Sequence, residues 1–99
     1  MSYLTQLPTK YDSAEWSSGG AVTNYDVSAQ ALFVNCLNPQ KVVIRADQAI
    51  TVKFNSTSNP AFTVSANTAF DLDFQFQKMY ITTTVDTAIK ILFLSTDPA

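Results

Sequence analysis

The chain has 99 residues, of which 46% are hydrophobic and 14% are charged, and its formal net charge is -2. This length suits one domain with one core, and the apolar content argues against intrinsic disorder. Six cations are too few for a surface that binds nucleic acid or anionic lipid. With no histidine and one cysteine, the chain lacks the side chains for a zinc site, an internal disulfide or a histidine-based hydrolase. We therefore expect no enzyme, no cofactor, no membrane or nucleic-acid partner and no small-molecule substrate.

The first twenty residues follow neither a two-residue nor a helical period. Pro8 and the pair Gly19 and Gly20 interrupt them, and we predict an extended arm over residues 1–20 ahead of a folded domain over residues 21–99. Large aromatic side chains contribute most when they are buried, so we expect the arm to dock on a partner. The arm residues expected to make that contact are Tyr3, Leu4, Leu7, Tyr11 and Trp16.

From about residue 21 onward, apolar and polar side chains alternate with the period of two that is typical of β-strands. In chain order the predicted strands are 21–27, 30–37, 41–46, 49–55, 61–66, 70–76, 79–85 and 88–95. Short turns separate them at a spacing that is typical of a sandwich or barrel. The predicted fold class is all-β: an antiparallel, jelly-roll-like β-sandwich of about eight short strands with an extended N-terminal arm.

Two local patterns give more specific expectations. The two residues Asp47 and Gln48 separate a pair of predicted strands, which favours a short hairpin between 41–46 and 49–55. The clearest alternation, over 70–76, places large apolar side chains on one face and polar ones on the other. The predicted core includes Val34, Ile44, Val52, Phe54, Phe70, Leu72, Phe74, Ile81 and Ile91.

Asp71 and Asp73 project from the same face of a predicted strand, an arrangement in which carboxylates can hold calcium or share a proton. Calcium needs six or more oxygen ligands, and the next acid along the chain is Asp86. A glycosidase would need two carboxylates in different environments, which the pattern does not provide. We therefore expect a solvated pair that binds no metal.

Trp16, Tyr25 and Tyr80 could stack on sugar rings or anchor a protein interface, and we favour the interface. If Leu32 and Val34 point inward with Cys36, Phe33 points outward, and the same alternation turns Leu92 and Leu94 outward. Contiguous apolar surface on a soluble protein usually marks an interface. The predicted oligomer interface consists of Phe33, Leu92, Leu94 and Tyr80.

These features together resemble the small β-sandwich decoration, or cement, proteins on the heads of tailed bacteriophages. Segments 42–55 and 89–94 are also similar to strand-turn-strand segments of phage virion proteins. The resemblance implies a non-enzymatic structural protein that self-associates, as a trimer, and stabilises a capsid by bridging subunits of the major capsid protein. It also implies synthesis in the host cytoplasm and a final place on the capsid surface of the virion. The alternative is a carbohydrate-binding β-sandwich, or a tail or collar module, for host attachment.

Overall fold

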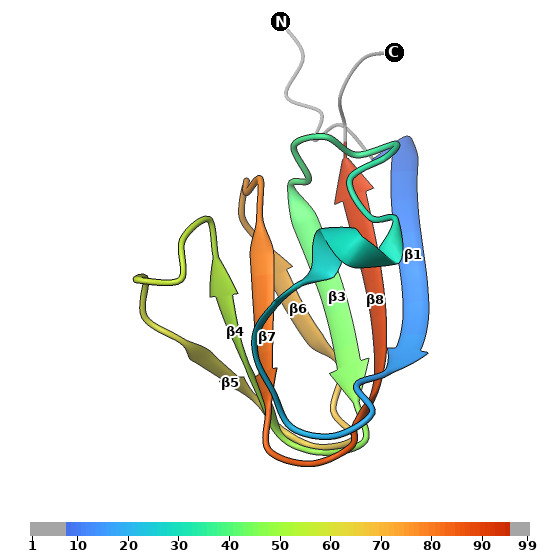
Figure 1. The fold of residues 1–99 in the computed structure, drawn as a ribbon. Helices are drawn as coiled ribbons and strands as arrows, with labels where there is room; N and C mark the ends of the chain where they lie inside the picture. Colours follow the sequence, from blue (N-terminus) through green and yellow to red (C-terminus); the bar gives the residue numbers. More distant parts are fainter. Residues whose placement is uncertain (1–7, 96–99) are drawn as a thin grey trace, which may run out of the picture.

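The computed structural model describes residues 8–95, which form two four-stranded antiparallel sheets packed face to face (Figure 1). One sheet has the strand order β1-β8-β3-β6 and the other has the order β2-β7-β4-β5. A short 3-10 turn, η1 (Val27–Gln30), follows the second strand. The strands are β1 (Lys10–Ser17), β2 (Val22–Asp26), β3 (Lys41–Ala46), β4 (Ile50–Phe54), β5 (Phe62–Val64), β6 (Phe70–Asp73), β7 (Met79–Thr83) and β8 (Ala88–Ser95).

The strand pairing is that of one long hairpin rolled into two layers. Counting outward from the β4–β5 pair, β3 pairs with β6, β2 with β7 and β1 with β8. Rolling adds the β3–β8 and β4–β7 ladders, which complete the two sheets. Two four-stranded antiparallel sheets with this nested order form a jelly roll. The predicted fold class, an antiparallel jelly-roll-like β-sandwich, is confirmed.

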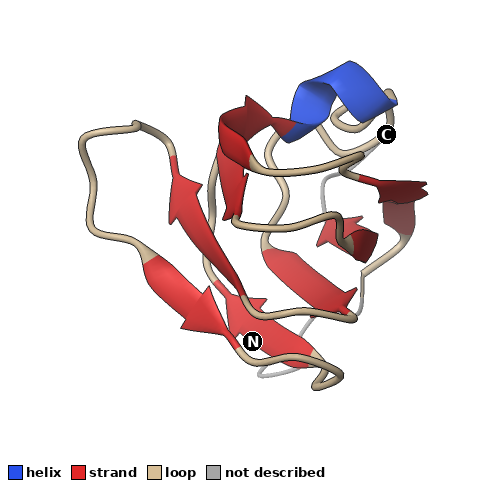
Figure 2. Ribbon diagram, turned by 60° about the horizontal axis from the view of Figure 1, so that its bottom comes forward, coloured by secondary structure: helices blue, strands red, loops and turns tan. Residues whose placement is uncertain are grey.

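At the corners of the roll, paired segments cross between the sheets together. The β1–β2, β3–β4, β5–β6 and β7–β8 segments cross at the lower end in Figure 1, which Figure 2 turns toward the viewer, and β2–β3 and β6–β7 cross at the opposite end. The N–H of Asn67 donates to the carbonyl of Ala46 at 2.7 Å, which joins the corner before β4 to the corner after β5. The N–H of Ser18 donates to the carbonyl of Thr87 at 2.8 Å, where β1 ends and β8 begins. These bonds satisfy buried backbone groups where the strand ladders are interrupted.

The predicted hairpin between residues 41–46 and 49–55 is wrong, because β3 and β4 lie in different sheets. The Asp47 N–H donates to the Ala88 carbonyl at 3.1 Å, and its carboxylate accepts the Ala88 N–H at 2.9 Å. Asp47 is therefore tied to β8, the neighbour of β3, and the chain turns from there into the opposite sheet. The alternation correctly gave β3 and β4 their buried faces, but it carries no information about which strand is the neighbour.

The first strand of the sandwich is also displaced from its predicted position. Residues 10–17, expected in the arm, form β1 and pair with β8 from Lys10 opposite Ser95 to Ser17 opposite Ala88. The expected division at residue 20 therefore does not hold for this segment. Residues 30–37, predicted as a strand, instead form the end of η1 and a loop, because β1 occupies the place beside β8. The arm contacts expected of Tyr3, Leu4 and Leu7 lie outside the described residues.

The core lies between the sheets and includes five of the predicted positions: Ile44, Val52, Phe54, Ile81 and Ile91. Phe70 and Leu72 are partly buried and pack against its margin. Two predicted core residues are exposed, Val34 at 64% and Phe74 at 43%. Val34 lies in the loop that replaces the predicted strand, and Phe74 follows the last residue of β6.

Phe76 fills the core position that Phe74 was expected to occupy. It is 1% exposed, and its ring centroid lies 4.9 Å from that of Phe54 and 5.2 Å from that of Phe93. Because β6 ends at Asp73, the strict alternation also ends there. The chain then follows the corner, where the N–H of Phe76 donates to the carbonyl of Pro39 at 3.1 Å.

Phe76→Ala is therefore expected to lower the free energy of unfolding by about 3–5 kcal/mol, because it opens a cavity among buried rings. Phe74→Ala removes the same atoms from a partly solvated site and should cost about 1 kcal/mol or less. Urea unfolding followed by far-UV circular dichroism measures both. Equal losses for the two variants would contradict the assignment of Phe76 to the core.

Candidate functional site

The outer face of the β1-β8-β3-β6 sheet carries an apolar stripe. Leu94 pairs with Tyr11 of β1, and Leu92 pairs with Val43 of β3. Tyr11 is 61% exposed, and the other three side chains are half-buried by their neighbours on the same face. We call these four residues the outer-face stripe. The alternation in the sequence predicted the outward direction of Leu92 and Leu94. The same period of two places Val43 on the outer face of β3.

Ion pairs border the stripe on both sides. On the β6 side, the Lys41 Nζ lies 3.3 Å from the Asp71 carboxylate and 3.5 Å from the Asp73 carboxylate. On the β1 side, Lys90 lies 3.5 Å from Glu15. The Asp71 and Asp73 carboxylates are exposed, as predicted, and they share a cation from the adjacent strand. An apolar centre with a charged border is the usual composition of a protein-binding surface.

The pKa of Lys41 lies above its ordinary value, because of the hydrogen bond to Asp71 and the negative charges of Asp71 and Asp73, which outweigh partial desolvation. A raised folded-state pKa means that the charged amine stabilises the fold. This contribution is fully present below the ordinary lysine pKa and is lost as the pH rises through the raised value. Salt screens it, because the pair is at the surface.

Lys41→Met should therefore lower the melting temperature slightly at neutral pH and low salt. The difference from the unaltered protein should disappear in strongly alkaline solution and shrink in high salt. Thermal unfolding over a pH series measures this, with Lys53→Met on the other sheet as the control. A difference that stays constant with pH would show that lost packing of the Lys41 stem, rather than its charge, is responsible.

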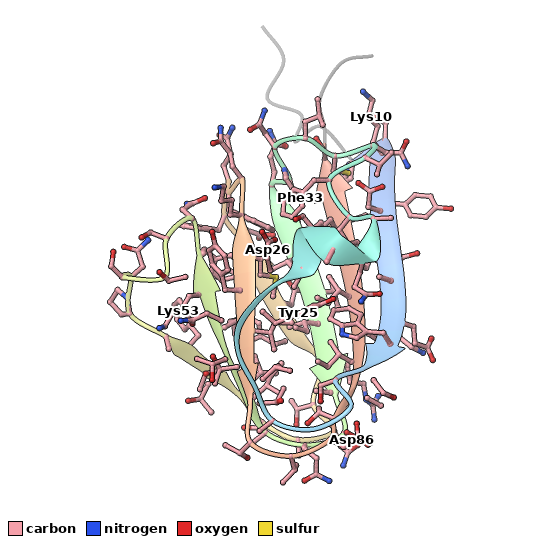
Figure 3. The ribbon with its side chains drawn as sticks, viewed as in Figure 1. Lys10, Tyr25, Asp26, Phe33, Lys53 and Asp86 are labelled. Carbon is pink, nitrogen blue, oxygen red and sulfur yellow. The ribbon has the colours of Figure 1, made fainter. Side chains whose placement is uncertain are left out.

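The predicted patch that joins Phe33 to Leu92 and Leu94 does not form. Phe33 lies over the core (Figure 3), with its ring centroid 4.8 Å from that of Phe93 and 6.2 Å from that of Phe76. Tyr80 is on β7, next to Lys53 of β4, and therefore belongs to the opposite sheet. Of the four predicted interface residues, only Leu92 and Leu94 share a surface, and their role in an interface stays a prediction.

Trp16, Tyr25 and Tyr80 do not form one aromatic platform. The Trp16 and Tyr25 rings lie against each other at the mouth between the sheets, with centroids 6.0 Å apart, and the Gln30 amide donates to the Tyr25 hydroxyl at 2.6 Å. The cavity beside them has a volume of about 100 Å³. Small-molecule sites usually enclose about 300–1,000 Å³. Tyr80 alternates with buried neighbours on β7 and faces away from this mouth.

A buried carboxylate on β1 holds the loop that replaces the predicted strand. Asp12 is 6% exposed and accepts the backbone N–H groups of Val34 at 3.1 Å, Asn35 at 3.0 Å and Cys36 at 2.8 Å. The Asn35 side-chain amide donates to the same carboxylate at 3.0 Å. Successive N–H groups that converge on an anion form a backbone nest. The loop thereby seals the core with Leu32 and Cys36, which are both buried.

The outer side of this loop and β1 line an open hollow of about 700 Å³. Three large exposed apolar side chains lie around it: Tyr11, Val34 and Leu37, which are 61%, 64% and 66% exposed. Asp12 also lines the hollow, but the chain's own N–H groups bind its carboxylate. The hollow is therefore a mixed polar and apolar surface beside a strand edge. The alternation over residues 30–37 predicted a strand, so it gave no signal that Val34 and Leu37 would line this hollow.

Asp12→Ala should lower the free energy of unfolding by about 2–4 kcal/mol, because three backbone N–H groups lose a charged acceptor. It should also loosen the loop and expose the single cysteine, Cys36, to thiol reagents. The rate of Cys36 labelling in the folded protein measures this. Asp26→Ala is the control, since Asp26 accepts only the Ser28 N–H, at 2.9 Å, on the surface. Unchanged labelling in Asp12→Ala would contradict the anchoring role of Asp12.

Residues 8–95 contain no cluster of three or more histidine, cysteine, aspartate or glutamate side chains that could hold a metal ion. No helix in that part of the chain is long and apolar enough to cross a membrane. Comparisons with protein-family models, with curated protein sequences and with solved structures give no match to this chain.

Proposed function

We propose that the protein is a non-enzymatic structural protein that stabilises a bacteriophage capsid by self-associating and bridging subunits of the major capsid protein. The observation that carries the proposal is the outer-face stripe: apolar side chains, bordered by ion pairs, on a regular antiparallel sheet. Catalytic and small-molecule sites are usually concave, with several polar groups that point into the same cavity. An apolar face with a charged border suits contact with another protein.

The fold adds support by analogy. Jelly rolls are common among viral capsid proteins, although they also occur in lectins and other proteins, so the fold alone does not assign a role. Among these possibilities, the resemblance to phage decoration proteins implies the capsid. It also implies a place on the outer surface of the virion after synthesis in the host cytoplasm.

The strength of the contact limits how the protein could act. Full burial of a Leu side chain contributes roughly 1.5–3 kcal/mol, and Leu92 and Leu94 are already half-buried by their neighbours. One copy would therefore bind a shell subunit weakly. Linking copies raises the effective concentration of each further contact. Self-association, as the trimer that the resemblance implies, is thus part of the proposed mechanism.

The carbohydrate-binding alternative has less support. Its aromatic residues are divided between the sandwich mouth and the opposite sheet, and the cavity at the mouth is small. A tail or collar module would use the same protein-binding face and would differ only in its place on the virion.

The test uses heads of the encoding phage assembled without this protein. The unaltered protein, added back, should co-sediment with these heads and raise the temperature at which they release DNA. Leu92→Asp should lose most of this binding, because it puts a charge in the outer-face stripe, whereas Ser17→Asp, on the same face away from the stripe, should retain it. Failure of the unaltered protein to bind heads, or its presence only in the tails of complete virions, would overturn the capsid proposal.

A further inference from the structure

We propose that two copies of the protein join through the free edge of β1, which pairs antiparallel with β1 of the second copy. The two four-stranded β1-β8-β3-β6 sheets then become one continuous sheet. This inference rests on the self-association in the proposed function and gives it a different symmetry: edge pairing makes a dimer, in place of the trimer that the resemblance implies. Its test uses the isolated protein and is independent of capsid binding.

The backbone of β1 directs alternate residues away from β8. In an antiparallel ladder only every second residue bonds to a given neighbour. Ser18 is the next even-numbered residue after β1, and its N–H donates to the carbonyl of Thr87, the residue just before β8. The even-numbered residues of β1 therefore bond to β8. The carbonyl of Tyr11, an odd-numbered position, is reached by the Asn35 side chain at 3.3 Å. The odd-numbered residues of β1 therefore present their N–H and carbonyl groups to the edge.

The other three sheet edges are protected against strand pairing in ways that natural proteins use. β5 has three residues and β6 has four, and β6 carries Asp71 and Asp73 on its outer face. The register of β2 shifts between Val22 and Tyr25, where Asn24 has a positive φ of 49°. Short, charged or irregular edges accept a further strand poorly.

β1 is longer and more regular than these edges, although it also carries a charged side chain, Glu15, on its outer face. Its eight residues include neither proline nor glycine, and its pairing with β8 runs without a register shift. One open hollow, of about 700 Å³, lies along residues 9–13. The Asn35 amide covers one carbonyl at one end of the strand, and a carbonyl oxygen has a second lone pair. The space beside β1 can therefore receive a strand.

The sequence of β1 fits a second copy of itself. In an antiparallel pair centred on Ser13, the small Ser13 side chains meet at the two-fold axis. Glu15 then lies opposite Tyr11, and Lys10 lies opposite Trp16, so no like charges oppose each other. Centring the pair on Glu15 would put two carboxylates directly opposite, which is unfavourable. The Ser13 register also pairs nearly the whole strand.

The symmetry of this contact follows from the edges. Because β1 is the longest and most regular of the four sheet edges in residues 8–95, another β1 edge is its best partner. Such a contact is isologous and closes after two copies. Edge pairing thus gives a dimer, whereas a trimer would need a different contact.

Disulfide cross-linking tests the register. In the Ser13→Cys variant, the two cysteines would face each other with Cα atoms about 5.5 Å apart, within the ~4.4–6.8 Å that disulfides span. In Ser17→Cys, a matched position on the same strand face, they would be about 27 Å apart. We expect mild oxidation to convert most of Ser13→Cys, and little of Ser17→Cys, to covalent dimer. The native Cys36 is buried and serves as the background.

Light scattering over a dilution series tests the symmetry, and the unaltered protein should have twice its 10.9 kDa mass. Ser13→Pro removes an edge N–H from each copy and should raise the dimer dissociation constant about tenfold or more, while Ser13→Ala should leave it unchanged. Circular dichroism confirms that each variant is folded. A monomer or trimer at all concentrations, or equal cross-linking of Ser13→Cys and Ser17→Cys, would overturn edge pairing. Capsid binding by a protein that proves trimeric would overturn edge pairing and leave the proposed function standing.

Discussion

The nested pairing of strands is the constraint on which the rest of the structure depends. Strands at equal distances along the chain from the β4–β5 turn pair with each other. The outermost pair therefore joins β1 and β8, the two strands farthest apart in the sequence. That pair decides two other features. It removes residues 30–37 from the sheet, because their expected place is taken, and it leaves β1 at the edge with its outer residues beside Leu92 and Leu94.

The period of two in the sequence was sufficient to predict the sheets but not their neighbours. It placed Ile44, Val52 and Ile91 in the core, because inward direction depends only on position along a strand. It failed at Phe74, because no pattern marks the end of β6 one residue earlier. It failed again for the hairpin at Asp47, because strand pairing depends on distant parts of the chain.

The candidate surface was predictable to the same extent. Leu92 and Leu94 alternate with buried residues, so their outward direction could be deduced from the sequence. Phe33 could not be placed, since its position depends on the capture of the following three N–H groups by Asp12, about twenty residues away in the sequence. A single carboxylate in an otherwise ordinary strand gives no signal that it will bind a distant loop. The position of Trp16 could not be predicted either. Its ring contacts Tyr25 of the other sheet, and this contact depends on how the two sheets pack.

The pairing of β1 with β8 also determines how the domain bears mechanical load. Lys10 lies opposite Ser95, so the two ends of the described chain leave the sheet side by side. A force that pulls these ends apart would break the hydrogen bonds of the β1–β8 ladder one after another. A force that stretches the outer face across its strands would load the hydrogen bonds of several ladders at once. The same fold is therefore weak when peeled from its chain ends and strong when stretched across its surface.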